Sequence, residues 1–220
     1  MEIGIFDVLG PVMVGPSSSH TAGAVRLGNI AGRIAGDNIK QADFYLHGSF
    51  AKTRRGHGTD KALLGGVMGM APDDERIRDA FSIAEKAGIV YEFHMTDLGN
   101  VHPNTARIVL KDQQDRIFEI TGSSIGGGKV LVTSLNGMHV EFNGQYPTVI
   151  TNHNDRPGVV ANVSAVLSGH GINIAFLKVF RQLRGSEACM VIENDQGIAP
   201  HILEELRQLP DINNVTLVDI

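Results

Sequence analysis

The segment Gly-Pro-Ser-Ser-Ser-His-Thr at 15–21 places three hydroxyls and an imidazole directly before a predicted helix. The free N–H groups and the dipole of a helix N-terminus favour an anion such as a carboxylate or a phosphate. One serine is enough to cap a helix, and three serines with His20 and Thr21 exceed that need. The segment is therefore a candidate anion site, with a simple helix cap as the alternative.

Two more histidines occupy loops that could present them to a ligand. His57 lies between Gly56 and Gly58 before a predicted helix, and His102 precedes Pro103, which favours an extended backbone at His102. Imidazoles titrate near neutral pH, so both are candidates for general acid–base chemistry. The alternatives are an exposed loop histidine at 57 and a simple turn at 102.

A fourth candidate is the segment 123–128, Ser-Ser-Ile-Gly-Gly-Gly, whose glycines could form an N–H nest for an anion or a flexible connection. Other chemistries have weaker support. The sequence contains no HExxH motif of a metalloprotease, and Ser17, Ser18 and Ser19 do not lie in the GxSxG elbow of a serine hydrolase. We therefore expect no metal site in this chain.

Composition narrows the class of protein further. The chain has 220 residues, 42% of them hydrophobic, and a formal net charge of −5. These values exclude a disordered chain and argue against nucleic-acid binding, which needs a basic surface. Without a transmembrane run or a signal peptide in the sequence, we expect a cytoplasmic protein that does not bind membranes. Cys189, the single cysteine, cannot by itself provide a Cys₄ zinc site or hold an iron–sulfur cluster.

The elements that must position these loops divide into two domains, 1–143 and 148–220. The first is predicted to be a mixed α+β domain with helices at 21–36, 60–70 and 73–87. Its strands are predicted at 42–47, 89–95, 105–111, 116–121 and 129–134, the last four alternating like antiparallel strands. The second domain is predicted to be a βαββαβ ferredoxin-like unit. Its elements are strands at 148–151, 172–180, 188–192 and 215–220 and helices at 159–167 and 202–209.

Six motifs extend over most of 1–135: FDVLG (6–10), GPSSSHT (15–21), LHGSF (46–50), GHGTD (56–60), HPNTAR (102–107) and SIGGG (124–128). Taken together they resemble the beta chain of iron–sulfur-dependent L-serine dehydratase (L-serine deaminase). The segments NDRPGV (154–159) and GINI (171–174) give residues 148–220 a resemblance to an ACT domain, a regulatory fold that often binds amino acids.

The resemblance implies a lyase of amino-acid catabolism that converts L-serine to pyruvate and ammonia. It implies a partner alpha subunit that carries a [4Fe–4S] cluster, so that this chain alone is inactive. By motif, Ser17, Ser18, Ser19, His20 and Thr21 would bind the substrate, and His57 and His102 would be catalytic.

For the ACT domain, the resemblance implies a small-molecule amino acid as ligand and association between copies. The expected regulatory ligand set is His153, Asp155, Gly158 and Asn173. The sequence here reads His153-Asn154-Asp155, where better-known serine-binding ACT domains resemble His-Glu-Asn. A non-catalytic, amino-acid-sensing regulatory subunit is the alternative function.

Overall fold

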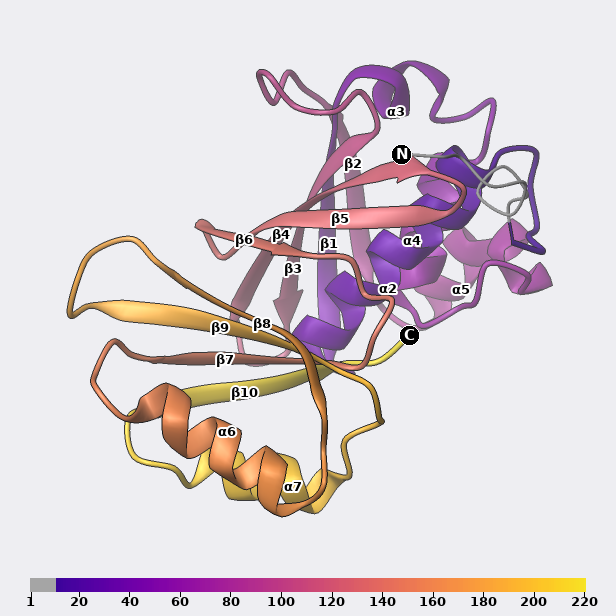
Figure 1. Cartoon of the computed structure of the whole chain (residues 1–220). Coiled ribbons are helices and arrows are strands. Elements are labelled where there is room, and N and C mark those ends of the chain that lie inside the picture. The colour runs from indigo at the N-terminus through magenta and orange to yellow at the C-terminus, as the bar shows by residue number, and fades with distance from the viewer. Residues whose placement is uncertain (1–10) are drawn as a thin grey trace, which may run out of the picture. The chain divides into compact units, whose positions relative to one another are not determined.

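The computed structural model describes residues 11–220, and the FDVLG motif at 6–10 lies outside this range. The chain divides into two compact units, Met1–Asn136 and Gly137–Ile220 (Figure 1). The predicted domain boundary at 144–147 lies a few residues after this division. The strand β6, Met138–Phe142, lies between this division and the predicted boundary, and it is the edge strand of the first sheet.

The first sheet has six strands in the order β2-β1-β3-β4-β5-β6. β2 is parallel to β1, whereas β3 and β4 continue the sheet in antiparallel pairs. The expectation that the strand at 89–95 is antiparallel is wrong, because a helical crossover separates it from β1 and returns the chain in the same direction. The strands are β1 Ile39–Leu46, β2 Val90–Met95, β3 Thr105–Asp112, β4 Ile117–Gly126, β5 Lys129–Leu135 and β6 Met138–Phe142.

Helices cover one face of this sheet (Figure 1). Phe44 of β1 stacks on Phe93 of β2, which in turn contacts Phe81 of α5 on that face. The helices lie together closely because the contacting positions are glycines: a Cβ on Gly28 of α2 would lie 2.3 Å from the Leu63 carbonyl oxygen of α4. The helical segments are η1 Ser18–Ala22, α2 Gly23–Ala35, α3 Gly48–Thr53, α4 Thr59–Val67, η2 Glu75–Asp79 and α5 Ala80–Lys86.

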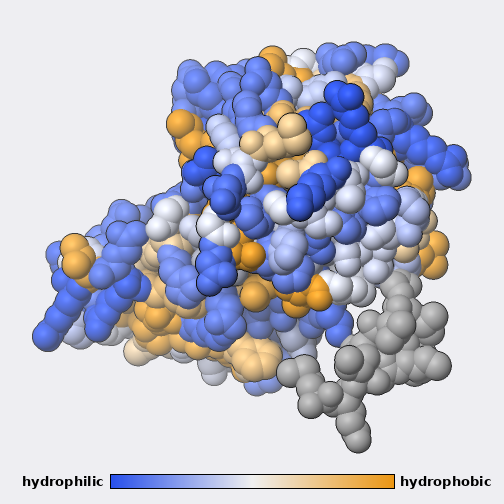
Figure 2. Space-filling model, turned by 90° about the horizontal axis from the view of Figure 1, so that it is seen from above, coloured by the Kyte–Doolittle hydropathy of each residue, from blue (hydrophilic) through white to orange (hydrophobic). Residues whose placement is uncertain are grey.

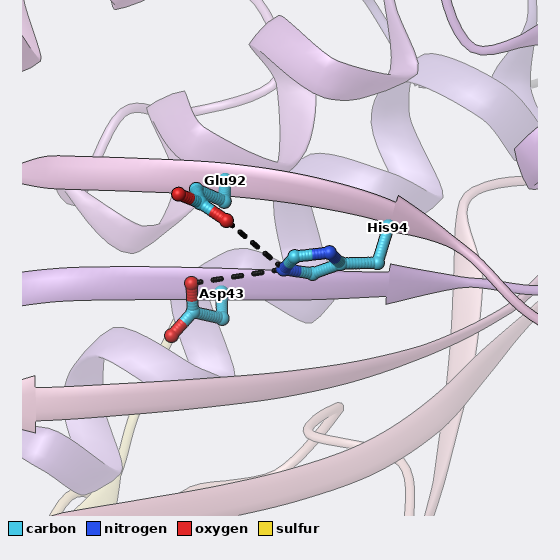
Figure 3. A group of neighbouring side chains, drawn as sticks. All are labelled: Asp43, Glu92 and His94. Atoms are coloured by element: carbon cyan, nitrogen blue, oxygen red, sulfur yellow. Dashed lines mark ion pairs between the residues drawn. The ribbon is translucent and has the colours of Figure 1, made fainter.

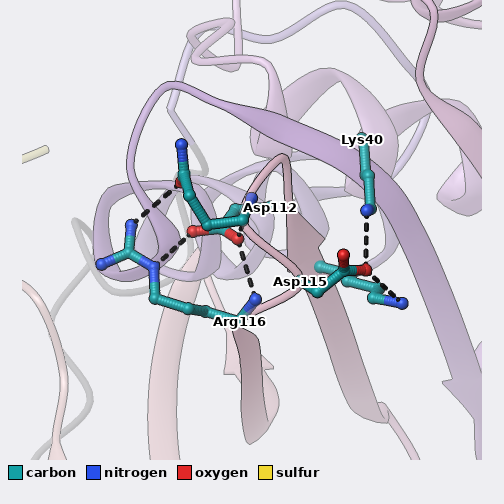
Figure 4. A network of polar contacts seen from close by, with 6 residues as sticks. Lys40, Asp112, Asp115 and Arg116 are labelled. Carbon is teal, nitrogen blue, oxygen red and sulfur yellow. Dashed lines mark hydrogen bonds and ion pairs between the residues drawn. The ribbon is translucent and has the colours of Figure 1, made fainter.

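A polar network closes the β3–β4 hairpin at the end of the sheet away from the candidate loops (Figure 4). The buried Asp112 carboxylate accepts hydrogen bonds from the Arg116 side chain, at 2.6 Å, and from the Arg116 backbone N–H. Asp115 pairs with Lys111 and Lys40, each at 2.7 Å, and these two lysines lower the pKa of Asp115 to about 2. The turn is therefore anchored by ionised carboxylates.

The second unit contains a four-stranded antiparallel sheet in the order β10-β7-β9-β8, with two helices. The predicted βαββαβ order is confirmed. Val149, Leu167 and Met190 belong to its buried core. The elements are β7 Thr148–Asn154, α6 Val159–Gly169, β8 Ile174–Arg181, β9 Glu187–Asn194, α7 Pro200–Arg207 and β10 Ile212–Val218.

Some boundaries differ from the sequence-based expectation. The helix predicted at 73–87 is a 3₁₀ turn, η2, followed by α5, and the helix α3 and the strand β6 were not predicted. β7 continues through Asn154, so His153 lies within a strand rather than in a loop. Pairing with β9 and β10 on both sides extends β7, an effect that the local sequence does not reveal.

Among residues 11–220, no helix is long and apolar enough to cross a membrane. Hydrophilic side chains cover most of the face shown in Figure 2, and the hydrophobic residues on it form patches between them.

Candidate functional site

The Ser-Ser-Ser-His-Thr segment forms a single turn of π-helix that leads into α2. Ser17 caps this turn: its Oγ lies 3.2 Å from both the backbone nitrogen and Nδ1 of His20. Ser18 accepts a hydrogen bond from the Gly23 backbone N–H, which closes the wide turn. Such turns are often found at functional sites. Ser17 is therefore a helix cap, which was the alternative to an anion site, and it also orients the imidazole of His20.

His20 is held from its other side by a serine that the sequence analysis did not select. Its Nε2 lies 2.9 Å from the Ser49 Oγ, so both ring nitrogens face serine hydroxyls. Burial lowers the pKa of His20, and the nearby His57 lowers it further. His20 is therefore a neutral imidazole near pH 7, able to donate from one nitrogen and accept at the other.

His57 lies against His20 from the next glycine-rich loop. The two ring centroids are 4.9 Å apart in an edge-on arrangement, and Thr21 Oγ1 donates to the His57 carbonyl oxygen at 3.4 Å. Gly58, with a φ of 67°, ends this loop and leads into α4. The Nδ1 of His57 is buried and has no hydrogen-bond partner within residues 11–220. Such an orphaned group is costly unless something else satisfies it.

The loop that carries His102 is hydrogen bonded to the loop that carries Ser49. The Ser49 backbone N–H donates to the Pro103 carbonyl oxygen at 2.8 Å, and that of His47 donates to the Thr105 carbonyl oxygen at 3.0 Å. Gly48 has a φ of 53°, and a Cβ there would lie 2.7 Å from the Pro103 carbonyl oxygen. His102 itself is exposed, and its Nδ1 accepts from the Asn104 backbone N–H at 3.1 Å.

The Ser123–Gly128 segment joins the same edge of the sheet. Ser123 Oγ lies 2.7 Å from Thr105 Oγ1, and the Ser124 backbone N–H donates to the Asn104 carbonyl oxygen at 3.0 Å. The Ser124 hydroxyl is fully buried, and within the described part of the chain it has no hydrogen-bond partner. The loops at 15–21, 46–50, 56–60, 102–105 and 123–128 therefore form one connected assembly.

A pocket of about 290 Å³ opens beside His57. It is close to the lower end of the usual range for ligand sites, about 300–1,000 Å³. Two other hollows, of about 350 and 480 Å³, contain none of the predicted substrate or acid–base residues. We regard the pocket of about 290 Å³ as the candidate site, because the loops that carry His20 and His57 both border it. Its lining includes Gly15, Thr21, His57, Lys61 and Arg78.

The predicted regulatory residues do not form one group within a single copy of the chain. His153 is buried in β7, where its Nδ1 lies 3.3 Å from Thr151 Oγ1 and burial lowers its pKa. Asp155 binds Arg181 and the backbone N–H of Gly185. The pairing of β7, β9 and β8 places Asn173 at the opposite end of this sheet, about 20 Å away along the strands.

The other two members of that set have local roles. Gly158, with a φ of 95°, begins α6, a conformation that side chains rarely adopt. Asn173 donates from its side chain to Asp195. Each polar side chain of the predicted set therefore already has a partner inside the second unit.

Comparison with protein families gives two matches. The serine dehydratase beta chain family matches residues 4–90, and the ACT domain family matches residues 148–211. The two units thus define a protein with a serine-dehydratase-type α/β domain followed by an ACT domain.

Curated relatives are similar over nearly the full length. The chain is 46% identical to a probable L-serine dehydratase beta chain of Bacillus subtilis, over 97% of each chain. It is 44% identical to the L-serine dehydratase beta chain of Peptoniphilus asaccharolyticus, over 88% of this chain and 87% of that one. A D-3-phosphoglycerate dehydrogenase of Bacillus subtilis is 28% identical over 90% of this chain but only 37% of its own. The chain belongs to the family of L-serine dehydratase beta chains.

Proposed function

We propose that this chain is the beta subunit of a two-subunit L-serine dehydratase and that an alpha chain completes its active site. The reaction removes the α-proton and the hydroxyl of L-serine as water. The resulting enamine tautomerises to an imine, which takes up water to give pyruvate and ammonia. That the chain is an L-serine dehydratase beta chain rests on its family relationship. That an alpha chain completes its active site is what we propose.

The observation that supports this proposal is an unsatisfied hydrogen-bonding group in the histidine site. His57 Nδ1 is a buried nitrogen without a hydrogen-bond partner in residues 11–220, beside a pocket and 4.9 Å, ring to ring, from His20. Buried polar groups in native proteins are nearly always paired. A substrate or a partner chain that contributes the missing group would satisfy this nitrogen.

The positions of the residues in this chain suggest a separate role for each in substrate binding and proton transfer. The turn 17–21 at the start of α2 would hold the substrate carboxylate, with neutral His20 fixed between Ser17 and Ser49. His57, which lines the pocket, would transfer the proton between the substrate and the site. His102, exposed on the adjoining loop, is the second acid–base candidate and faces outward, where a partner could cover it.

The cluster expected in this enzyme class does not fit the residues of this chain. Cys189 is the single thiol; it is almost fully buried in β9, and burial raises its pKa to about 12. We therefore assign the [4Fe–4S] cluster to the alpha subunit, where it would supply a Lewis acid for the substrate hydroxyl. The protein is thus proposed to require a heteromeric complex for activity.

The decisive experiment is anaerobic co-expression with a cluster-bearing alpha chain, followed by co-purification and a pyruvate assay with L-serine. We expect a stable complex that forms pyruvate, whereas neither chain alone does so. A beta chain that produces pyruvate alone, or a complex that is inactive with its cluster intact, would contradict the proposal.

A purely regulatory subunit is the second candidate function. The observation in its favour is the alignment of 90% of this chain with part of a phosphoglycerate dehydrogenase, together with the ACT domain. The two functions differ in their dependence on His57 and His102. If replacement of both histidines altered only regulation by an amino acid, the regulatory function would be correct.

We also propose that copies of the chain associate through the ACT domain. β8 is an edge strand of its sheet, and Phe176 and Val179 on it are 54% and 41% exposed. Unpaired strand edges and exposed apolar side chains favour association. Sedimentation of the wild type and of a Phe176→Glu variant tests this, with dissociation expected in the variant.

A further inference from the structure

A second group of potential ligands lies on the sheet face opposite the helices. Asp43 of β1 and Glu92 and His94 of β2 bring three ligand atoms within 4.8 Å of one another (Figure 3). His94 Nε2 lies 3.9 Å from Asp43 Oδ1 and 3.6 Å from Glu92 Oε2. The three residues come from two neighbouring strands and do not belong to the histidine site.

The charges in this group are unbalanced. Asp43 and Glu92 are direct partners in the parallel β1–β2 pair, and like charges directly opposite each other destabilise a sheet. Among residues 11–220, neither carboxylate has an ion pair with a lysine or an arginine, and both share His94 as their ion-pair partner. The group therefore has no lysine or arginine among residues 11–220 to balance its two carboxylates.

The side chains are held in positions that suit a bound ion. The His94 ring stacks on Tyr45 at 4.7 Å between centroids, which fixes the imidazole plane. Gln41 donates to Oδ2 of Asp43 at 2.8 Å, leaving Oδ1 directed toward His94. Metal-binding carboxylates are commonly held by such outer hydrogen bonds. On the neighbouring strand β3, Arg107 lies over the Tyr45 ring and Lys111 pairs with Asp115.

We propose that Asp43, Glu92 and His94 bind one divalent transition-metal ion, with zinc as the best fit. Nitrogen and oxygen ligands on a tetrahedron with bonds of about 2.0–2.2 Å lie about 3.3–3.6 Å apart. The two separations from His94, 3.6 and 3.9 Å, are close to this range, and all three ligand atoms lie within 4.8 Å of one another, so side-chain movements can bring them together. A metal here would join the edge strand β2 to β1 and remove the repulsion between the two carboxylates.

The test is titration of the purified full-length chain with Zn²⁺ alone, read by competition with a chromogenic chelator. Co²⁺ replaces Zn²⁺ in a parallel titration, to read the ligand field from its absorption spectrum. The variants are Glu92→Gln, which keeps the shape, and His94→Phe, which keeps an aromatic ring on Tyr45. We expect one tight equivalent in the wild type and at least 10-fold weaker binding in both variants. Zinc should also raise the Tm of the wild type more than that of either variant.

Two matched variants separate this site from other histidines. His170→Phe removes an imidazole that pairs with Glu205 at 2.6 Å in the second unit, and we expect it to bind zinc like the wild type. His57→Ala identifies any ion held by the His20–His57 pair. Equal zinc affinity and stoichiometry in the wild type and in His94→Phe would overturn the proposal, as would loss of the equivalent only in His57→Ala.

Discussion

The two units differ in whether the polar side chains of their predicted sites have hydrogen-bond partners. At the loop edge of the first sheet, His57, Thr59 and Ser124 each bury a polar atom that has no partner among residues 11–220. In the second unit, the predicted ligand residues are paired: His153 with Thr151, Asp155 with Arg181 and Asn173 with Asp195. The orphaned atom found there, Asn194 Oδ1, belongs to none of these residues.

The difference indicates which unit depends on another molecule. An unpaired buried polar atom costs about 1–3 kcal/mol, so the first unit gains when a substrate or a partner satisfies its loops. A ligand of the second unit must instead replace bonds that already exist. We therefore expect the first unit to carry the chemistry and the second to respond to its ligand by rearranging hydrogen bonds.

The largest expected effect is that of His57→Ala on turnover in the assembled enzyme. If His57 transfers the proton, its loss lowers kcat by about 100-fold or more, because positioned acid–base groups contribute about 10²–10⁴-fold. Pyruvate formation by the co-purified complex measures this. His170→Ala in the second unit, where the imidazole lies at the surface beside Glu205, is the control and should leave kcat unchanged.

A normal kcat in His57→Ala, with the complex and its cluster intact, would remove His57 from the mechanism. It would also reverse the comparison, since the orphaned nitrogen would then be a structural defect rather than part of a site. Substitution of His102 in the same assay ranks the two acid–base candidates.

The next-largest expected effect is on the free energy of unfolding, and it compares the same substitution at one glycine in each unit. Gly28→Ala places a Cβ 2.3 Å from the Leu63 carbonyl oxygen, between α2 and α4 that carry the candidate loops. We expect a loss of about 1–3 kcal/mol in the free energy of unfolding, the usual cost of overpacking. At Gly169 of α6 a Cβ meets no atom within 4 Å, so Gly169→Ala should be neutral or stabilising by up to about 1 kcal/mol.

Denaturant unfolding followed by circular dichroism measures both variants. A Gly28→Ala protein as stable as the wild type would show that α2 and α4 are free to separate. Their close approach would then not be what holds His20 and His57 together.

Most of the fold follows from local sequence patterns. Alternating and helical periodicities located the main strands and helices, and the βαββαβ order of the second unit is confirmed. The direction of β2, the extension of β7 through His153 and the edge strand β6 were not predicted. The first two depend on pairing with strands distant in the sequence, which local periodicity does not encode. β6 instead follows β5 directly across Asn136-Gly137, a local hairpin signal that the sequence-based prediction did not use.

The candidate loops were found because their residue types exceed structural need, as in the three serines before α2. Their assembly was not predictable, since Ser49 reaches His20 across 29 positions in the sequence. The Asp43–Glu92–His94 group was missed for the same reason. A carboxylate on one strand and two ligands on another leave no spacing motif, and only the register of β1 and β2 brings them together.

The smallest expected effect is acid destabilisation, for which one paired carboxylate in each unit provides a test. Lys111 and Lys40 lower the pKa of Asp115 to about 2, and the Gly185 N–H with Arg181 lowers that of Asp155. A carboxyl whose pKa is lower in the folded state stabilises the fold above the unfolded pKa near 3.8, and this contribution is lost as pH falls through the folded pKa. Both units should therefore weaken below about pH 4, where the unfolded carboxyls begin to take up protons.

Asp115→Asn and Asp155→Asn separate the two contributions. Asparagine tolerates the positive φ of 65° at position 115, so the first change removes the charge without a new backbone strain. Amide exchange between about pH 5 and pH 2.5 should show a weaker acid dependence in β3 and β4 for Asp115→Asn, and in β8 and β9 for Asp155→Asn. If either substitution changed exchange equally in both sheets, the two units would unfold as one, and the contrast between them would hold for their hydrogen bonding but not for their stability.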